Sequence, residues 1–198
     1  MSVSVDASGV LTARLNRDEV AVLRAMVDLL CRVCNDPAFG PPLASPGPDE
    51  SPDDLLARLS REWTDASAAQ ARPEDPATRR LFPDACPSDA DVSADFRRLT
   101  LSDQRLAKLA AAEVVRAGLD RVDGRGRVRV LPGQRTAWLT TLAAIRLVLA
   151  ARLGIDADDD DDRLAALAQT DPRHWMYNIY MWTAWLQESV VECLTNRP

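Results

Sequence analysis

The sequence predicts an all-α protein: a single-domain helical bundle that can carry a small, winged-helix-like β-hairpin. Long segments repeat apolar residues at a spacing of three and four, which is typical of helices with one buried face. Loops rich in Pro, Gly and Ser separate these segments, and no internal repeat divides the chain. At 198 residues and 46% hydrophobic content, the chain is long enough to bury one substantial core.

The first 34 residues predict a short lead and then a helix. Residues 1–15 alternate loosely between apolar and polar side chains, so we expect one or two strands or a flexible lead. The helical domain, residues 16–198, begins with a helix from Asn16 to Cys34, where Asn16 is a good cap and Glu19 completes a capping box.

Three loops are predicted within the helical domain, at 36–51, 72–91 and 156–162, from their Pro, Gly or acidic composition. A helix begins after the first loop at Ser51 and fades near Gln70. The acidic run in the third loop has no turn glycine, so we interpret it as solvated chain leading to a helix start at Arg163 and not as a calcium site.

The middle of the chain predicts two helical pieces and a hairpin. The first piece covers Val92–Leu99, and the next is capped by Thr100 or Ser102 and ends at Gly118. Residues 120–134 then predict a two-stranded hairpin with a turn at 123–126, because valines alternate with arginines after the glycines.

Two strongly apolar helices complete the chain. The segment Gln134–Leu153, ended by Gly154, is apolar on several faces and is the best candidate for the central helix of the bundle. The last helix, Pro172–Thr195, carries an aromatic stripe that is either core or an oligomer interface. We therefore also consider a homodimer.

Composition argues against several functional classes. No apolar run reaches the roughly 18 residues of a membrane span and the start lacks a secretion signal, so we expect a cytoplasmic protein. The net charge of -6 argues against nucleic-acid binding by the whole surface. His174 is the only histidine, and no phosphate loop or nucleophile elbow is present. We therefore expect no enzyme activity, cofactor or metal.

Cys31 and Cys34 are the only closely spaced cysteine pair, and they lie at a predicted helix end. Three interpretations stay open: two small apolar core residues, half of a zinc site that lacks a second pair, or a redox switch. Cβ atoms three residues apart in a helix are about 5–6 Å apart, whereas a disulfide needs about 3.8 Å. Oxidation would therefore deform the last helical turn, which is a way to sense oxidants.

A cluster of arginines gives the 116–135 segment a positive charge within an acidic chain. Its candidate contact residues for DNA or a partner are Arg121, Arg125, Arg127, Arg129 and Arg135. As the wing of a winged helix they could contact phosphates. Alternatively, they are solvated side chains that pair with acids such as those in the 156–162 run.

Three segments resemble the actinobacterial AosR-type oxidative-stress regulator family, once known only as a domain of unknown function and encoded beside the adaptor ClpS. They are RRLFPDACPSDADVSADFRRLT (79–100), WLTTLAAIRLVLAARLGI (138–155) and WLQESVVECL (185–194). The resemblance implies redox-dependent transcription control through an intramolecular disulfide and a sigma-factor partner. That disulfide would be placed on Cys31 and Cys34. Cys86 departs from the family pattern, because an aromatic residue is expected there.

Two functions follow as hypotheses. The first is a redox-responsive transcription regulator that senses oxidants through Cys31 and Cys34 and acts through DNA, a sigma factor, or both. The second is a non-catalytic adaptor linked to ClpS-dependent proteolysis, in which the cysteines are structural. The roles of Cys86 and Cys193 stay open in both hypotheses.

Overall fold

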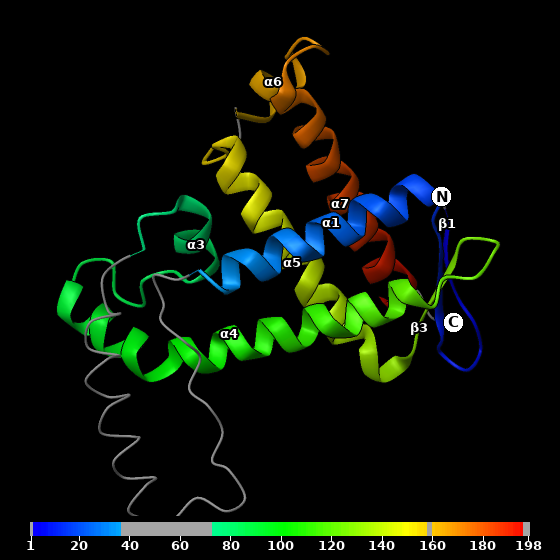
Figure 1. Ribbon diagram of the computed structural model, residues 1–198, viewed down its shortest axis with the longest axis horizontal. Helices are drawn as coiled ribbons and strands as arrows, with labels where there is room; N and C mark the ends of the chain where they lie inside the picture. Colours follow the sequence, from blue (N-terminus) through cyan, green and yellow to red (C-terminus); the bar gives the residue numbers. More distant parts are fainter. Residues whose placement is uncertain (1, 37–72, 158–159, 196–198) are drawn as a thin grey trace, which may run out of the picture.

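The computed structural model describes residues 2–36, 73–157 and 160–195, which form mostly helices with a small antiparallel sheet at one end (Figure 1). The predicted helix at 51–70 lies outside these residues, as does nearly all of the loop predicted at 36–51. The described elements, in chain order, are β1 Ser2–Val5, β2 Leu11–Arg14, α1 Arg17–Cys34, α3 Pro76–Leu81, α4 Ala90–Asp120, β3 Arg127–Val130, η2 Pro132–Gln134, α5 Arg135–Leu153, α6 Asp160–Ala165 and α7 Pro172–Thr195.

Helix α5 is the centre of the core, as its apolar sequence predicts. Its Leu142, Ile145 and Leu149 are at most 1% exposed, and the helix contacts α1, α3, α4 and α7. It ends at Gly154, which has the left-handed φ of 70° that favours glycine. The segment Pro132–Leu153 is apolar and long enough to cross a membrane, and half of its most apolar stretch of 18 residues is buried inside the protein. Its place in the core accounts for that composition.

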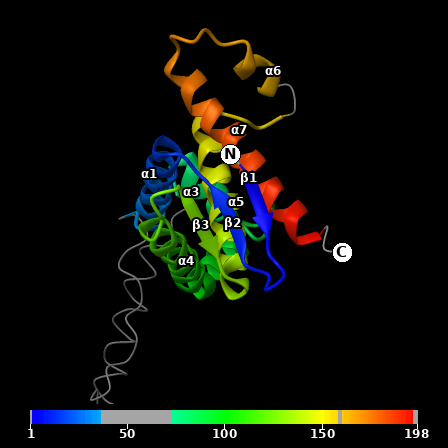
Figure 2. The same cartoon turned by 90° about the vertical axis from the view of Figure 1, so that its right-hand side faces the viewer.

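The structure differs from the two-stranded hairpin that the sequence predicts at 120–134. Only β3 forms a strand there, and it pairs with β2 from the start of the chain, in the order β1-β2-β3 among the described residues. Val128 and Val130 are buried while Arg129 is exposed, so the alternation in the sequence marks a strand but does not identify its partner. The two strands predicted as alternatives in 1–15 are present as β1 and β2. Figure 2 shows the three strands side by side.

Helix α4 runs unbroken through the boundary predicted at Thr100 or Ser102. The Thr100 hydroxyl donates to the Phe96 carbonyl one turn earlier at 2.8 Å instead of capping a new helix. The two predicted pieces are therefore one helix of 31 residues. The loop predicted at 72–91 contains the short helix α3, capped by Asp75 with Pro76 in its first turn.

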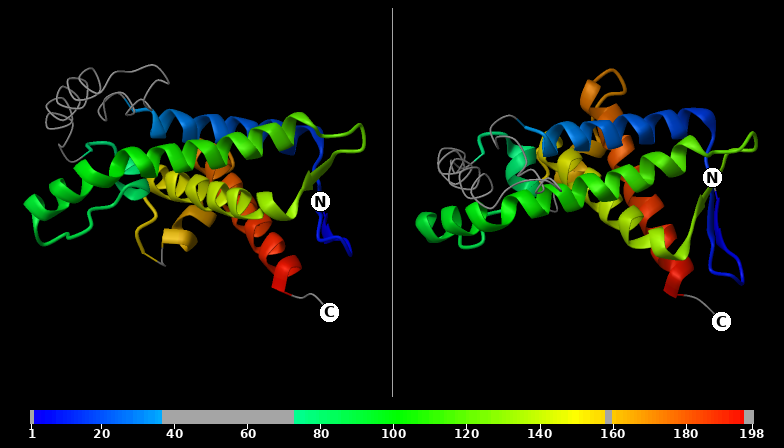
Figure 3. Two further views of the ribbon diagram at one scale, coloured as in Figure 1. Left: turned by 90° about the horizontal axis from the view of Figure 1, so that it is seen from below. Right: turned by 60° about the horizontal axis from the view of Figure 1, so that its bottom comes forward.

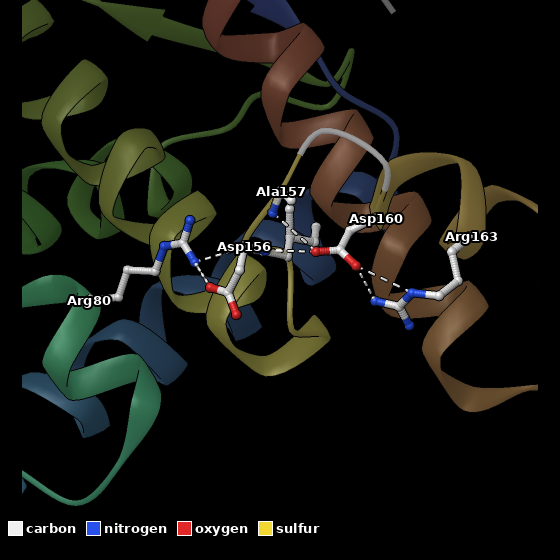
Figure 4. A network of polar contacts seen from close by, with 6 residues as sticks. Arg80, Asp156, Ala157, Asp160 and Arg163 are labelled. Atoms are coloured by element: carbon white, nitrogen blue, oxygen red, sulfur yellow. Dashed lines mark hydrogen bonds and ion pairs between the residues drawn. The ribbon is translucent and has the colours of Figure 1, made fainter.

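Helix α6 begins at Asp160, inside the acidic run and three residues before the predicted start at Arg163. The Asp160 carboxylate accepts from the backbone amides of Asp156 and Ala157 and contacts Arg163 at 2.7 Å (Figure 4). These contacts hold the pKa of Asp160 at about 2, chiefly through the Asp156 amide. Asp160, Asp161 and Asp162 thus form the first turn of a helix, where the sequence predicts a loop up to Arg163.

Candidate redox site at the end of helix α1

Cys31 and Cys34 lie in the last turn of α1, where the sequence places them. Asn16 caps the start of that helix with the predicted capping box, in which the Glu19 amide donates to Asn16 Oδ1 at 2.8 Å. Both cysteines are free thiols. The Cys34 side chain is fully buried in the main core, whereas Cys31 is partly exposed. The pair therefore consists of one thiol that solvent can reach and one that it cannot.

The end of α1 is fastened by two sets of hydrogen bonds. Within the helix, the Asn35 amide donates to the carbonyls of Cys31 at 3.0 Å and Arg32 at 3.2 Å. From α4, Arg105 Nε donates to the Cys34 carbonyl at 2.8 Å. Arg105 is only 3% exposed, so this is a buried contact between a charged donor and a carbonyl at a helix end. The last turn of α1 is therefore fixed to the middle of α4.

Burial raises the pKa of both thiols. The pKa of Cys34 reaches about 11, first because burial disfavours its thiolate and second because Cys31 lies close by, although Lys108 and Arg105 oppose the shift. Burial also raises the pKa of Cys31, partly offset by Arg116. Both residues are therefore protonated at neutral pH. Since the thiolate is the nucleophile, each reacts slowly with oxidants.

The position still allows one chemical event with a structural consequence. A disulfide between residues three apart requires their Cβ atoms to approach by more than about 1 Å relative to a regular helix. That approach distorts the turn in which the Asn35 amide and Arg105 are bound. The contacts that fasten α1 to α4 are thus the ones that such a bond would disturb.

The two other cysteines lie on different elements. Cys86 is in the connection before α4, where its amide donates to Ser93 Oγ at 3.1 Å and Ser93 Oγ donates to its carbonyl at 2.7 Å. Cys193, near the end of α7, donates to the Val3 carbonyl at 3.6 Å. Within the described ranges, no three Cys, His, Asp or Glu side chains gather into a group that could hold a metal ion.

The predicted arginine contact set divides into engaged and exposed side chains. Arg127 contacts Asp123 at 2.6 Å, and Arg135 donates to the Gly9 carbonyl. Exposed members of the set are Arg121, Arg125 and Arg129. Two described acids of the 156–162 run contact arginines outside this set, since Asp156 contacts Arg80 at 2.9 Å and Asp160 contacts Arg163 (Figure 4).

Arg105 is the site residue that the sequence analysis missed. It lies four residues after Leu101 and seven before Ala112, on the face that α4 buries. A charge in line with apolar residues such as these is uncommon unless it has a partner. That misfit in the pattern was the available signal, but it does not say that the partner is a carbonyl 71 residues earlier.

Comparison with known proteins gives one family match. The sequence model described as "Domain of unknown function (DUF2017)" matches residues 2–194, which is nearly the whole chain and covers all the elements described above except the last residue of α7. No curated protein matches the chain, and no solved structure matches it.

Proposed function

The chain belongs to the DUF2017 family, a domain of unknown function, and from that premise we propose that it is a redox-responsive transcription regulator without enzyme activity. In this proposal Cys31 and Cys34 are the sensor. One observation carries the proposal: the partly exposed thiol of Cys31 lies one turn from buried Cys34, whose carbonyl fastens α1 to α4 through Arg105. The resemblance to AosR-type oxidative-stress regulators supports the same function.

Oxidation begins at Cys31 because it is the more exposed thiol of the pair. Its thiolate attacks hydrogen peroxide, the O–O bond breaks, and a sulfenic acid forms with release of hydroxide, which takes up a proton to become water. The Cys34 thiol then gives up its proton and its sulfur attacks the Cys31 sulfur, the S–O bond breaks, and the departing hydroxide takes up a proton to leave as a second water. Two thiols lose two hydrogens in total and one peroxide is reduced to two waters.

The disulfide converts this chemistry into movement. The distorted turn no longer presents the Cys34 carbonyl to Arg105, so the end of α1 and the middle of α4 separate. The output in this proposal is altered contact with a sigma factor, with DNA, or with both. Arg121, Arg125 and Arg129 are the exposed side chains available for phosphates or acidic partner residues. A cytoplasmic homodimer remains part of the proposal.

Peptide mapping after mild peroxide treatment tests the sensor. We expect a Cys31–Cys34 disulfide, seen as a loss of two hydrogens in the peptide that contains both residues. Hydrogen exchange should then speed up at the end of α1 and in α4 near Arg105. The Cys193→Ser variant is the matched control and should respond normally, while Cys31→Ser should not respond. A pair that stays reduced while Cys86 or Cys193 oxidises contradicts the proposal.

The burial of Cys34 favours a second candidate function, a non-catalytic adaptor linked to ClpS-dependent proteolysis. Full burial and a pKa of about 11 are typical of a cysteine that serves as a small core residue. This function predicts that a Cys31→Ser, Cys34→Ser double variant binds purified ClpS as the unchanged chain does, before and after peroxide. Loss of ClpS binding on oxidation, or no ClpS binding at all, contradicts it.

A further inference from the structure

The first half of α4 has its polarity reversed. Its buried face carries polar and charged side chains: Ser93 is 2% exposed, Arg97 9% and Arg105 3%. Each has a partner inside the protein, since Ser93 bonds the Cys86 backbone, Arg97 pairs with Asp84, and Arg105 bonds the Cys34 carbonyl. When the buried face of a helix is polar, its solvent-facing side is ordinarily polar as well.

The outer face is apolar instead. Val92, Phe96, Leu99 and Leu106, here called the α4 stripe, are between 41% and 65% exposed. With Asp103 and Ala110 they follow a strict four-three alternation from 92 to 110, which is the pattern of residues that face another helix. Figure 3 shows this end of α4 extending past the ends of α1 and α5. An exposed row of large apolar side chains typically marks an interaction surface.

The charge around the α4 stripe is negative. Exposed residues of α4 between 91 and 110 include Asp91, Asp95 and Asp103 but no Lys or Arg. Three of the four cations of this stretch are turned elsewhere, since Arg97 and Arg105 are buried and Lys108 lies over the Phe82 ring at 5.6 Å. The fourth, Arg98, pairs with Asp95 at 2.9 Å, which leaves Asp91 and Asp103 as the net negative charge of this face. A partner that fits this face therefore offers apolar side chains flanked by positive charge.

We propose that the α4 stripe docks a basic amphipathic helix of a partner protein, with leucine-like anchors between rows of Lys or Arg. A second copy of this chain fits less well, because a two-fold contact would set Asp91 and Asp103 of one copy against the same residues of the other. This inference goes beyond the proposed function and does not depend on the thiol chemistry of Cys31 and Cys34.

Two designed peptides test the proposal with the full-length chain. Each is a helix of about 20 residues, which matches the length of the stripe at about 1.5 Å per residue. Both carry leucines in the four-three alternation, and they differ only in flanking arginines or glutamates. We expect the Arg peptide to bind one-to-one by calorimetry and the Glu peptide to bind at least about tenfold more weakly. Binding of the Arg peptide should weaken as salt is raised.

Variants locate the binding site. Leu99→Glu should weaken binding of the Arg peptide at least about tenfold, because Leu99 is 65% exposed and its replacement spares the core. Leu147→Glu, at a 39% exposed leucine of α5, is the matched control and should leave binding unchanged. Both variants should keep the circular dichroism spectrum and melting temperature of the unchanged chain.

Several results overturn the proposal. Equal binding of the two peptides, no binding, or equal effects of Leu99→Glu and Leu147→Glu would each do so. Sedimentation of the chain as a dimer that Leu99→Glu converts to a monomer would assign the stripe to a second copy. Failure of a maleimide to label Leu99→Cys in the chain alone, mapped by mass spectrometry, would mean that the chain itself covers the stripe.

Discussion

Arg105 Nε donates a 2.8 Å hydrogen bond to the carbonyl oxygen of Cys34, so a buried guanidinium of α4 caps the end of α1. Burial lowers the pKa of Arg105, and the proximity of Cys34 and Asp36 opposes that shift. The bond satisfies a carbonyl that has no acceptor role left within its own helix. A change in the conformation of the last turn of α1, which contains Cys31 and Cys34, would therefore also affect α4.

Replacing Arg105 with methionine should destabilise the protein. The Cys34 carbonyl loses a charged donor in a buried setting, and such bonds are worth about 1.5–3 kcal/mol. We expect a loss of that size in the free energy of unfolding, measured in urea. The control is Arg116→Met, where a surface pair with Glu113 is removed and the expected loss is below about 1 kcal/mol. Equal losses would argue that Arg105 does not fasten the helix end.

The reactivity of the thiol pair should be low at neutral pH and should rise steeply with pH. Because burial raises the pKa of Cys34 to about 11, its alkylation by iodoacetamide should speed up about tenfold for each pH unit between 8 and 10. Cys31 should react before Cys34, since it is the more exposed. Peptide mass spectrometry over a series of pH values measures both rates. A rate that is already maximal at pH 7 would contradict the raised pKa values.

The same shift makes stability depend on pH in a defined direction. The folded pKa of Cys34 lies above its ordinary value of 9.0, so folding favours the protonated thiol. This contribution is fully present below about pH 9 and is lost as pH rises toward 11. We therefore expect Cys34→Ala to cost more stability at pH 7.5 than at pH 10 in urea unfolding. If Cys34→Ala costs more stability at pH 10 than at pH 7.5, then the folded pKa of Cys34 is lowered and not raised.

Gly126 should be the least replaceable glycine of the turn before β3. It has φ of 71°, and a Cβ there would lie 2.1 Å from the Leu15 carbonyl oxygen. Gly126→Ala should therefore cost about 3 kcal/mol or more, because the clash is with backbone that binds β2 to this turn. Gly124→Ala is the control, since nothing lies within 4 Å of its Cβ. Thermal unfolding of both variants separates the two cases.

Asp123 should contribute stability that acid removes. The Arg127 amide is the main cause that lowers its pKa to about 2, followed by the Arg127 side chain. A lowered folded pKa means that the contribution is present above about pH 4 and is lost as pH falls toward 2. We expect Asp123→Asn to destabilise the protein at pH 6 but to have little effect at pH 2. An effect of equal size at both values, measured by urea unfolding, would exclude this role.

The candidate site was predictable in part. The capping box at Asn16 and Glu19 and the apolar spacing placed Cys31 and Cys34 in the last turn of a helix, because those signals act within a few residues. Their difference in exposure could not be predicted, since it depends on what packs over each side of that turn. Arg105 was visible only as a charge in line with apolar Leu101 and Ala112, and its partner comes from another helix.

The sequence by itself determined the long helices α1, α5 and α7, the glycine that ends α5, and the strand character of 127–130. Capping, helical periodicity and alternation are local properties, so a few neighbouring residues suffice to encode them. Only the tertiary structure decided that β3 pairs with β2, that α4 continues through Thr100, and that its outer face is the apolar one. These outcomes depend on buried hydrogen bonds and packing between residues far apart in the chain, which no local pattern contains.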